Sequence, residues 1–239
     1  PAPRLRASLP RVTTWNELVA WDAFVVPRYL LTAPQYARQH SRTVLHGLCA
    51  FTRFHEGAHL DQSVNKHSAP GYCAVMGRLW YRRWGPPAAA KVDLGSAFDS
   101  EEFLQSAREW GFAVEAAPKG AHWCHGLAER GGQTLKILVC RVLEEEPTAN
   151  LSLVVEECVF VKNCSILVDG LTPYQRLIGV NPRLPDLENA TLGQLCLPAE
   201  GERLQIRELA RKHIALMDVD HCLKRGMACN VRWRPKQYA

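Results

Sequence analysis

The sequence lacks the long apolar segments that mark membrane proteins. No run of apolar residues approaches the roughly 18 that a membrane-spanning helix needs, and the longest candidates, such as LVAWDAFVV at 18–26, have the length of a strand. No signal peptide opens the chain, which begins at Pro1 without a methionine. We therefore expect no membrane partner and a chain cut from something longer.

Paired cysteine motifs are also absent. The chain has nine cysteines, an odd number, and no two of them form a CxxC pair. This pattern argues against both a disulfide framework and a zinc ribbon. A reducing, intracellular setting is the better interpretation. We find no internal repeat and no long low-complexity segment.

Acidic residues are missing from both ends of the chain. Residues 1–11 carry three arginines and residues 222–239 carry five cations, whereas the net charge of the whole chain is only +5. A mildly acidic body with basic ends suits a protein that contacts polyanions through its termini. Ends that only keep the chain soluble would show the same composition, so both interpretations stay open.

Hydrophobic patterning predicts a chain that begins with three strands and then alternates between helices and strands before it ends in helices. Short runs of strand-forming residues predict strands at 16–26, 42–54, 56–60, 88–94 and 112–117, with a bend at or near Gly57. Apolar stripes and end signals predict helices at 68–85, 99–111, about 122–145, 148–164 and 201–225. Residues 168–179 read as a turn. This order suggests a mixed sheet with helices on both faces.

Three acidic residues occupy unusual places in this pattern. Asp22 lies inside the apolar run VAWDAF, Asp93 closes a short strand, and Glu129 lies in the first turns of the helix at about 122–145. Each alone has an ordinary interpretation: an edge-strand aspartate in water, a turn former, or a solvated helix charge. Between Asp93 and Glu129 lie 35 residues, enough for the chain to return to the strand end. Several converging carboxylates are what a two-Mg²⁺ phosphoryl-transfer site needs.

The stretches around these acids resemble the catalytic core of retroviral and retrotransposon integrases, a branch of the ribonuclease-H-like nucleotidyl transferases. VDLGSAFDSEEFLQSAREWGF is similar to the family's aspartate–x–glycine–x–x–phenylalanine turn and the helix after it, and HWCHGLAERGGQTLK is similar to its glutamate helix. LHGLCAFTRFHEGAHL resembles the second and third strands, and LTPYQRLIGVNPRLP the segment that closes the core. The resemblance covers about residues 12–185.

The resemblance implies an α/β fold with a ribonuclease-H-like, mixed five-stranded sheet flanked by helices. It divides the chain into a basic tail at 1–11, the core at 12–185, and an extension at 186–239 with one helix and a basic tail. Asp22, Asp93 and Glu129 would hold two Mg²⁺ or Mn²⁺ ions. The reactions implied are trimming of a DNA end and joining of the new 3′-hydroxyl to target DNA.

Further expectations concern partners and location. On the glutamate helix, the resemblance implies DNA contacts from His125, Arg130, Gln133 and Lys136, although a solvated helix surface would look the same. The implied partners are double-stranded DNA, namely element ends and target, and at least one further copy of the chain. The implied location is nuclear during action on host DNA, within a longer polyprotein. The family's amino-terminal His-His-Cys-Cys zinc module is not visible in this sequence.

Three positions depart from the family pattern. Leu94 stands where a polar residue usually follows the second aspartate, Ala97 where an acid often precedes the phenylalanine, and Cys49 where relatives have a strand-two aspartate. None is a metal ligand in that pattern. They leave room for a catalytically silent, integrase-derived domain for DNA binding or assembly. A second alternative is a ribonuclease-H-like hydrolase that makes no joined products.

Overall fold

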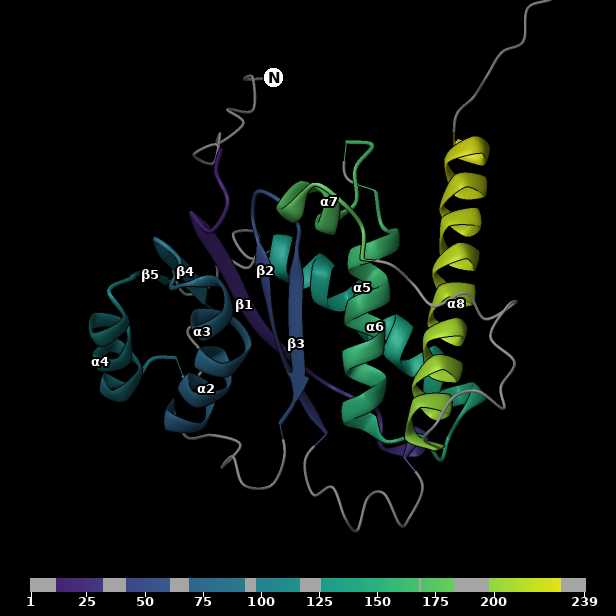
Figure 1. The fold of residues 1–239 in the computed structure, drawn as a ribbon, viewed down its shortest axis with the longest axis horizontal. Coiled ribbons are helices and arrows are strands. Elements are labelled where there is room, and N and C mark those ends of the chain that lie inside the picture. Colours follow the sequence, from purple (N-terminus) through teal and green to yellow (C-terminus); the bar gives the residue numbers. More distant parts are fainter. Residues whose placement is uncertain are drawn as a thin grey trace, which may run out of the picture.

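A five-stranded mixed sheet forms the centre of the molecule. The computed structural model describes residues 12–31, 42–60, 69–92, 98–116, 126–167, 169–182 and 198–228. The strand order is β3-β2-β1-β4-β5 (Figure 1). The strands are β1 (Leu18–Val25), β2 (Thr43–Cys49), β3 (His55–His59), β4 (Ala89–Val92) and β5 (Ala113–Ala116). The first three pair antiparallel, whereas β4 and β5 run parallel to β1. The predicted mixed five-stranded sheet is confirmed.

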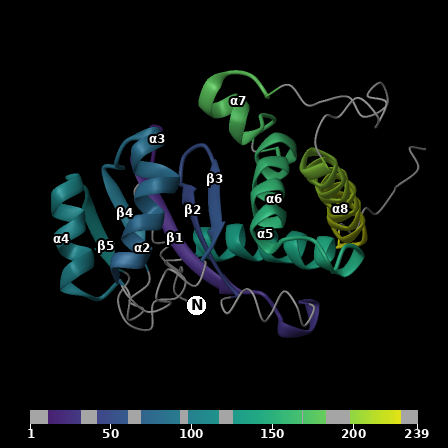
Figure 2. The same ribbon diagram turned by 60° about the horizontal axis from the view of Figure 1, so that its bottom comes forward.

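Helices cover both faces of this sheet, as the sequence predicted. On one face lie α2 (Ala69–Met76), the π-helical η2 (Gly77–Tyr81), α3 (Arg82–Trp84) and α4 (Glu101–Trp110). On the other lie α5 (Gly126–Glu145) and α6 (Leu151–Ser165), with α8 (Pro198–Ala228) outside them (Figure 2). Two short helices, η1 (Arg28–Leu30) and α7 (Pro173–Ile178), complete the described elements. Each face buries its own hydrophobic cluster.

The central strand β1 contributes to both clusters because its side chains alternate. Val19 and Trp21 are fully buried in the cluster under α2, whereas Phe24 packs against the cluster formed by α5 and α6. Residues two apart on a strand share a face, so Asp22 lies on the same face as Phe24. That face is the one covered by α5.

Local end signals explain why α4 begins and ends where it does. The Ser100 hydroxyl accepts a hydrogen bond from the backbone N–H of Phe103 at 3.2 Å, and two glutamates occupy the first turn. Gly111 ends the helix with a left-handed φ of 78°, which glycine adopts without steric cost. The predicted helix at 99–111 is confirmed.

The expected turn at 168–179 was wrong in part, because α7 lies within it. Thr172 and Gln175 form a capping box, in which each side chain bonds the other's backbone N–H, and Pro173 fills the first helical position. Gly179, with φ 82°, ends the helix. The glycine and proline signals therefore mark the two ends of a short helix.

Close packing explains the glycine at position 57, where the sequence suggests a bend. Gly57 lies within the paired part of β3, opposite His46. A Cβ at this position would lie 3.3 Å from Cγ2 of Val159 on α6. The absent side chain lets α6 approach the sheet closely.

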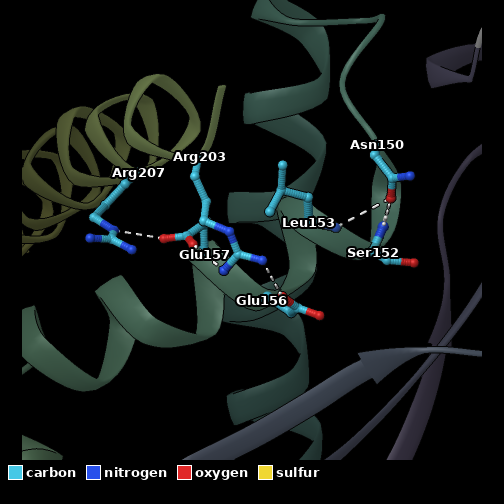
Figure 3. Close-up of polar contacts among 7 residues, drawn as sticks. All are labelled: Asn150, Ser152, Leu153, Glu156, Glu157, Arg203 and Arg207. Atoms are coloured by element: carbon cyan, nitrogen blue, oxygen red, sulfur yellow. Dashed lines mark hydrogen bonds and ion pairs between the residues drawn. The ribbon is translucent and has the colours of Figure 1, made fainter. Parts of the chain in front are cut away.

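Ion pairs fasten the long helix α8 to the body. The carboxylate of Glu157 on α6 is 2% exposed and accepts hydrogen bonds from Arg203 at 3.1 Å and from Arg207 at 2.6 Å (Figure 3). Arg203 also pairs with Glu156 at 3.1 Å. Because Glu157 is buried and both its oxygens are paired with arginines of α8, these contacts hold the two helices together. The predicted helix of the C-terminal extension is confirmed, and it packs on α6.

The described residues also bear on the expectations about membrane-spanning helices and disulfides. None of the helices in this part of the chain is long and apolar enough to cross a membrane. The described cysteines, at positions 49, 73, 140, 158, 164 and 222, are all free thiols.

Candidate active site

Asp22 lies in the middle of β1, the central strand. Its backbone pairs with His46 of β2 in an antiparallel register, and its Oδ1 accepts a hydrogen bond from the backbone N–H of Ala23 at 2.7 Å. The residue is half-buried. Burial raises the pKa of Tyr72 on α2, and the negative charge of Asp22 adds to this rise. Asp22 is thus a half-buried carboxylate in the middle of the central strand.

The neighbouring strand β4 ends at the level of this aspartate. In the parallel pairing of β1 and β4, Val92 is the partner of Trp21. Val92 precedes Asp93 in the sequence, and Trp21 precedes Asp22. Asp93 itself lies outside the described residues, together with Leu94 and Ala97.

Glu129 lies in the first turn of α5 and is exposed. The helix packs tightly over the sheet three residues later, because a Cβ at Gly132 would overlap Nε2 of His46. His46 is the cross-strand partner of Asp22, and the side chains of two directly paired residues lie on the same face of a sheet. Asp22 therefore lies on the sheet face that α5 covers, and Glu129 precedes the point of closest approach, Gly132, by three residues on that helix.

A buried polar network under α5 was missed by the sequence analysis. Nδ1 of His46 lies 3.0 Å from Nε2 of His55, and Nδ1 of His55 lies 2.5 Å from Nζ of Lys162 on α6. Burial lowers the pKa of His46 to about 3, with a smaller contribution from Lys162. Burial likewise lowers the pKa of Lys162 to about 7, and Arg53 adds to this effect. No local pattern could reveal the network, because His55 and Lys162 are 107 positions apart.

The DNA-contact candidates of the glutamate helix have different exposures. Arg130 and Gln133 are exposed, whereas Lys136 is half-buried. Nε of Arg130 donates to the carbonyl oxygen of Gly126 at 2.8 Å, so the helix holds this side chain along its own first turn. His125 lies outside the described residues.

The available oxygen donors suit a hard divalent cation. Asp22 and Glu129 both carry carboxylate oxygens, and Mg²⁺ prefers such ligands together with retained water. Among the residues that the structure describes, no three potential ligands form a metal-binding group. The third carboxylate of the predicted set, Asp93, is outside that part of the chain. Cys49, at the family's strand-two position, is buried in the hydrophobic cluster under α2.

Known proteins resemble this chain in sequence and in fold. The Pro-Pol polyprotein of feline foamy virus is 29% identical over 106 residues, which make up 44% of this chain and 9% of that polyprotein. The chain thus spans less than a tenth of this curated relative. A solved structure of the HTLV-2 integrase catalytic core domain, a magnesium complex in its dimeric form, superposes with a TM-score of 0.51 at 16% identity. The match covers 69% of this chain and 98% of that domain. No family model matches the chain.

These similarities confirm the resemblance to retroviral integrase catalytic cores and the ribonuclease-H-like fold. The polyprotein relative also fits the expectation that the chain is part of a longer protein.

Proposed function

We propose that this chain is an integrase-type DNA nucleotidyl transferase, which trims the 3′ ends of retroelement DNA and joins them to target DNA. The observation that supports it most is the position of Asp22 in mid-strand β1, on the sheet face that α5 covers and on which α5 carries Glu129. The parallel register of β4, with Val92 beside Trp21, puts the residue before Asp93 next to the residue before Asp22.

In this proposal, Asp22, Asp93 and Glu129 together bind two Mg²⁺ or Mn²⁺ ions. Two such ions, when bound, would activate the attacking oxygen and stabilise the leaving oxygen of the phosphodiester. The protein's part is to position the carboxylates, and Asp22 on a central strand and Glu129 on a helix belong to the elements that do this best. Gly132 contributes by letting α5 lie directly on His46.

Lys136 is proposed to contact DNA and not the ions. It follows Glu129 by seven residues, which corresponds to about 10 Å along a helix at 1.5 Å per residue. A cation at that distance can reach a phosphate while the ions stay with the carboxylates. Arg130, Gln133 and His125 are the other proposed contacts of this helix. Double-stranded DNA and a second copy of the chain are the proposed partners, in the nucleus of the host cell.

The test compares Asp93→Asn with Lys136→Ala in a DNA-binding assay and in an oligonucleotide joining assay with Mn²⁺. Asp93→Asn keeps the size of the side chain and removes its charge, so it should abolish trimming and joining while DNA binding is retained or slightly stronger. Lys136→Ala should weaken binding and leave slow cleavage measurable at high DNA concentration. Asp99→Asn, an exposed aspartate six residues further on, is the matched control and should behave as wild type.

The outcomes separate the three functions under consideration. Wild-type joining by Asp93→Asn would refute the proposed mechanism. DNA binding without any Mn²⁺-dependent cleavage by the unmodified chain would identify a silent, integrase-derived binding domain. Cleavage without joined products, at every DNA concentration tried, would instead indicate a ribonuclease-H-like hydrolase.

A further inference from the structure

The turn between β2 and β3 holds an arginine in an unusual backbone conformation. Arg53 has a φ of 65°, and its backbone N–H donates to the carbonyl oxygen of Cys49 at 3.0 Å. A non-glycine residue in this left-handed region is uncommon and typically costs on the order of 1–3 kcal/mol. Nη1 of Arg53 is also buried with no hydrogen-bond partner among the described residues. A buried donor without an acceptor is costly, so this atom is suited to an incoming acceptor.

A second arginine reaches the same turn from α7. The guanidinium of Arg176 lies 5.0 Å from the centre of the Phe51 ring, and the side chain is only 15% exposed. Its ion-pair partner is Asp169, at 3.3 Å, whose side chain is 88% exposed. The ring of Tyr174 lies 5.2 Å from that of Phe54, which fixes α7 against the turn. Arg176 is thus held over the turn by aromatic packing on both elements.

A third arginine approaches from the start of α5. Gly131 packs against this end of β2 and β3, where a Cβ would lie 2.9 Å from Leu48 and 3.8 Å from His55. Arg130, the preceding residue, is exposed and adjoins Glu129. Burial lowers the pKa of Arg53, and the positive charges of Arg130 and Arg176 lower it further. The positive charges of Arg130 and Arg176 therefore both act on Arg53. Among the described residues, Asp169 is the carboxylate that counteracts their effect on the pKa of Arg53.

We propose that Arg53, Arg130 and Arg176 form a binding site for a phosphodiester group of the DNA backbone. The inference rests on the proposed function, since Arg130 follows the metal-binding candidate Glu129 on the same turn of α5. Guanidinium groups donate paired hydrogen bonds that match phosphate oxygens, and clustered positive charge without equal acid favours an anion. A phosphate here would accept a hydrogen bond from the unpartnered Nη1 of Arg53 and would hold DNA beside the carboxylates proposed to bind the metal ions.

The test measures the affinity of the whole chain for a fluorescent DNA duplex by anisotropy, at several NaCl concentrations and with EDTA present. The slope of log Kd against log salt reports the number of phosphates contacted, at about 0.9 per contact. Arg53→Gln and Arg176→Gln should each reduce the slope by about one, and the double variant by about two. Arg53→Lys keeps the charge and should keep most of the slope. Arg108→Gln, an exposed arginine of α4 on the other face of the sheet, should change nothing.

One variant should act in the opposite direction. Asp169→Asn removes the carboxylate that competes with DNA for Arg176, and asparagine tolerates the φ of 52° at this position. Its affinity for the duplex should therefore rise. Thermal unfolding of each variant without DNA checks that the fold persists, and only variants with the wild-type melting profile are compared.

The results distinguish this inference from the proposed function, because binding in EDTA needs no catalysis. Unchanged slopes in both glutamine variants, with joining intact in the wild type, would refute the arginine site alone. Reduced slopes in a chain that never cleaves DNA would support the site and refute the enzymatic proposal. Inorganic phosphate at matched ionic strength is the last comparison. It could raise the melting temperature of the wild type but not of Arg53→Gln, while the salt slopes of DNA binding stay the same in all variants. In that case the site binds free phosphate and the DNA proposal is wrong.

Discussion

Replacing Lys162 by methionine tests the buried network under α5. Lys162 lies on α6 within 2.5 Å of Nδ1 of His55, and only 6% of the residue is exposed. Burial, with a smaller effect of Arg53, lowers the pKa of Lys162 from 10.5 to about 7. At about 1.4 kcal/mol for each pKa unit, keeping this amine charged in the folded state costs on the order of 5 kcal/mol. Methionine has a similar length and no charge.

The pH dependence follows from the sign of this change. Below pH 7 both the folded and the unfolded chain hold the proton, so the cost is fully present. Between about pH 7 and 10.5 the unfolded chain still holds the proton that the folded chain has lost. The wild type therefore gains stability with rising pH in this window, by up to about 1.4 kcal/mol per pH unit, and the variant lacks this gain.

Urea unfolding of both proteins at pH 7, 8 and 9 measures the effect. The free energy of unfolding of Lys162→Met minus that of the wild type should be largest at pH 7 and should fall steadily toward pH 9. The lost hydrogen bond to His55 adds a constant, because burial keeps His55 neutral throughout this range. Other titrating groups cancel in the difference. A difference for Lys162→Met that stays constant from pH 7 to 9 would refute the reasoning.

Two further predictions concern the glutamate helix and the C-terminal tail. Gly132→Ala should destabilise the fold by about 1–3 kcal/mol in urea unfolding, because its Cβ would overlap the buried ring of His46. In the control Gly126→Ala the new Cβ meets nothing within 4 Å, so stability should change far less. Equal effects of the two substitutions would contradict the close packing at Gly132. Deleting residues 222–239 should flatten the salt dependence of nonspecific DNA binding by up to about five contacts' worth, if all five cations touch phosphate. An unchanged slope would mean that this end only keeps the chain soluble.

Part of the fold could be predicted because its signals are local. The helix α4 was predictable from Ser100, at which it begins, and Gly111, at which it ends, because each acts on the adjacent helical turn. The apolar runs of β1 and β2 predicted strands for the same reason. Errors arose where one signal has two local meanings, as for the glycines and the proline around α7, which fit a turn and the ends of a helix equally well.

The candidate site was predictable only in its residue types and spacing. Asp22 and Glu129 were proposed from the sequence and a resemblance, and the structure puts Asp22 on the sheet face that is covered by α5, the helix of Glu129. The place of Asp93 in the triad stays a prediction. Arg53 and Arg176 were not predicted, because nothing near either residue in the sequence indicates that they meet over Phe51.

The sequence by itself determined most of the segments that become strands and helices, α7 excepted, since hydrophobic period and end residues act over a few positions. The tertiary structure alone decided which side chains share an environment. The order β3-β2-β1-β4-β5 brings Asp22 beside His46, and the packing of α6 brings Lys162 to His55 across 107 positions. Burial then sets the charge of these groups, and burial depends on every element that surrounds them, so no local pattern in the chain encodes it.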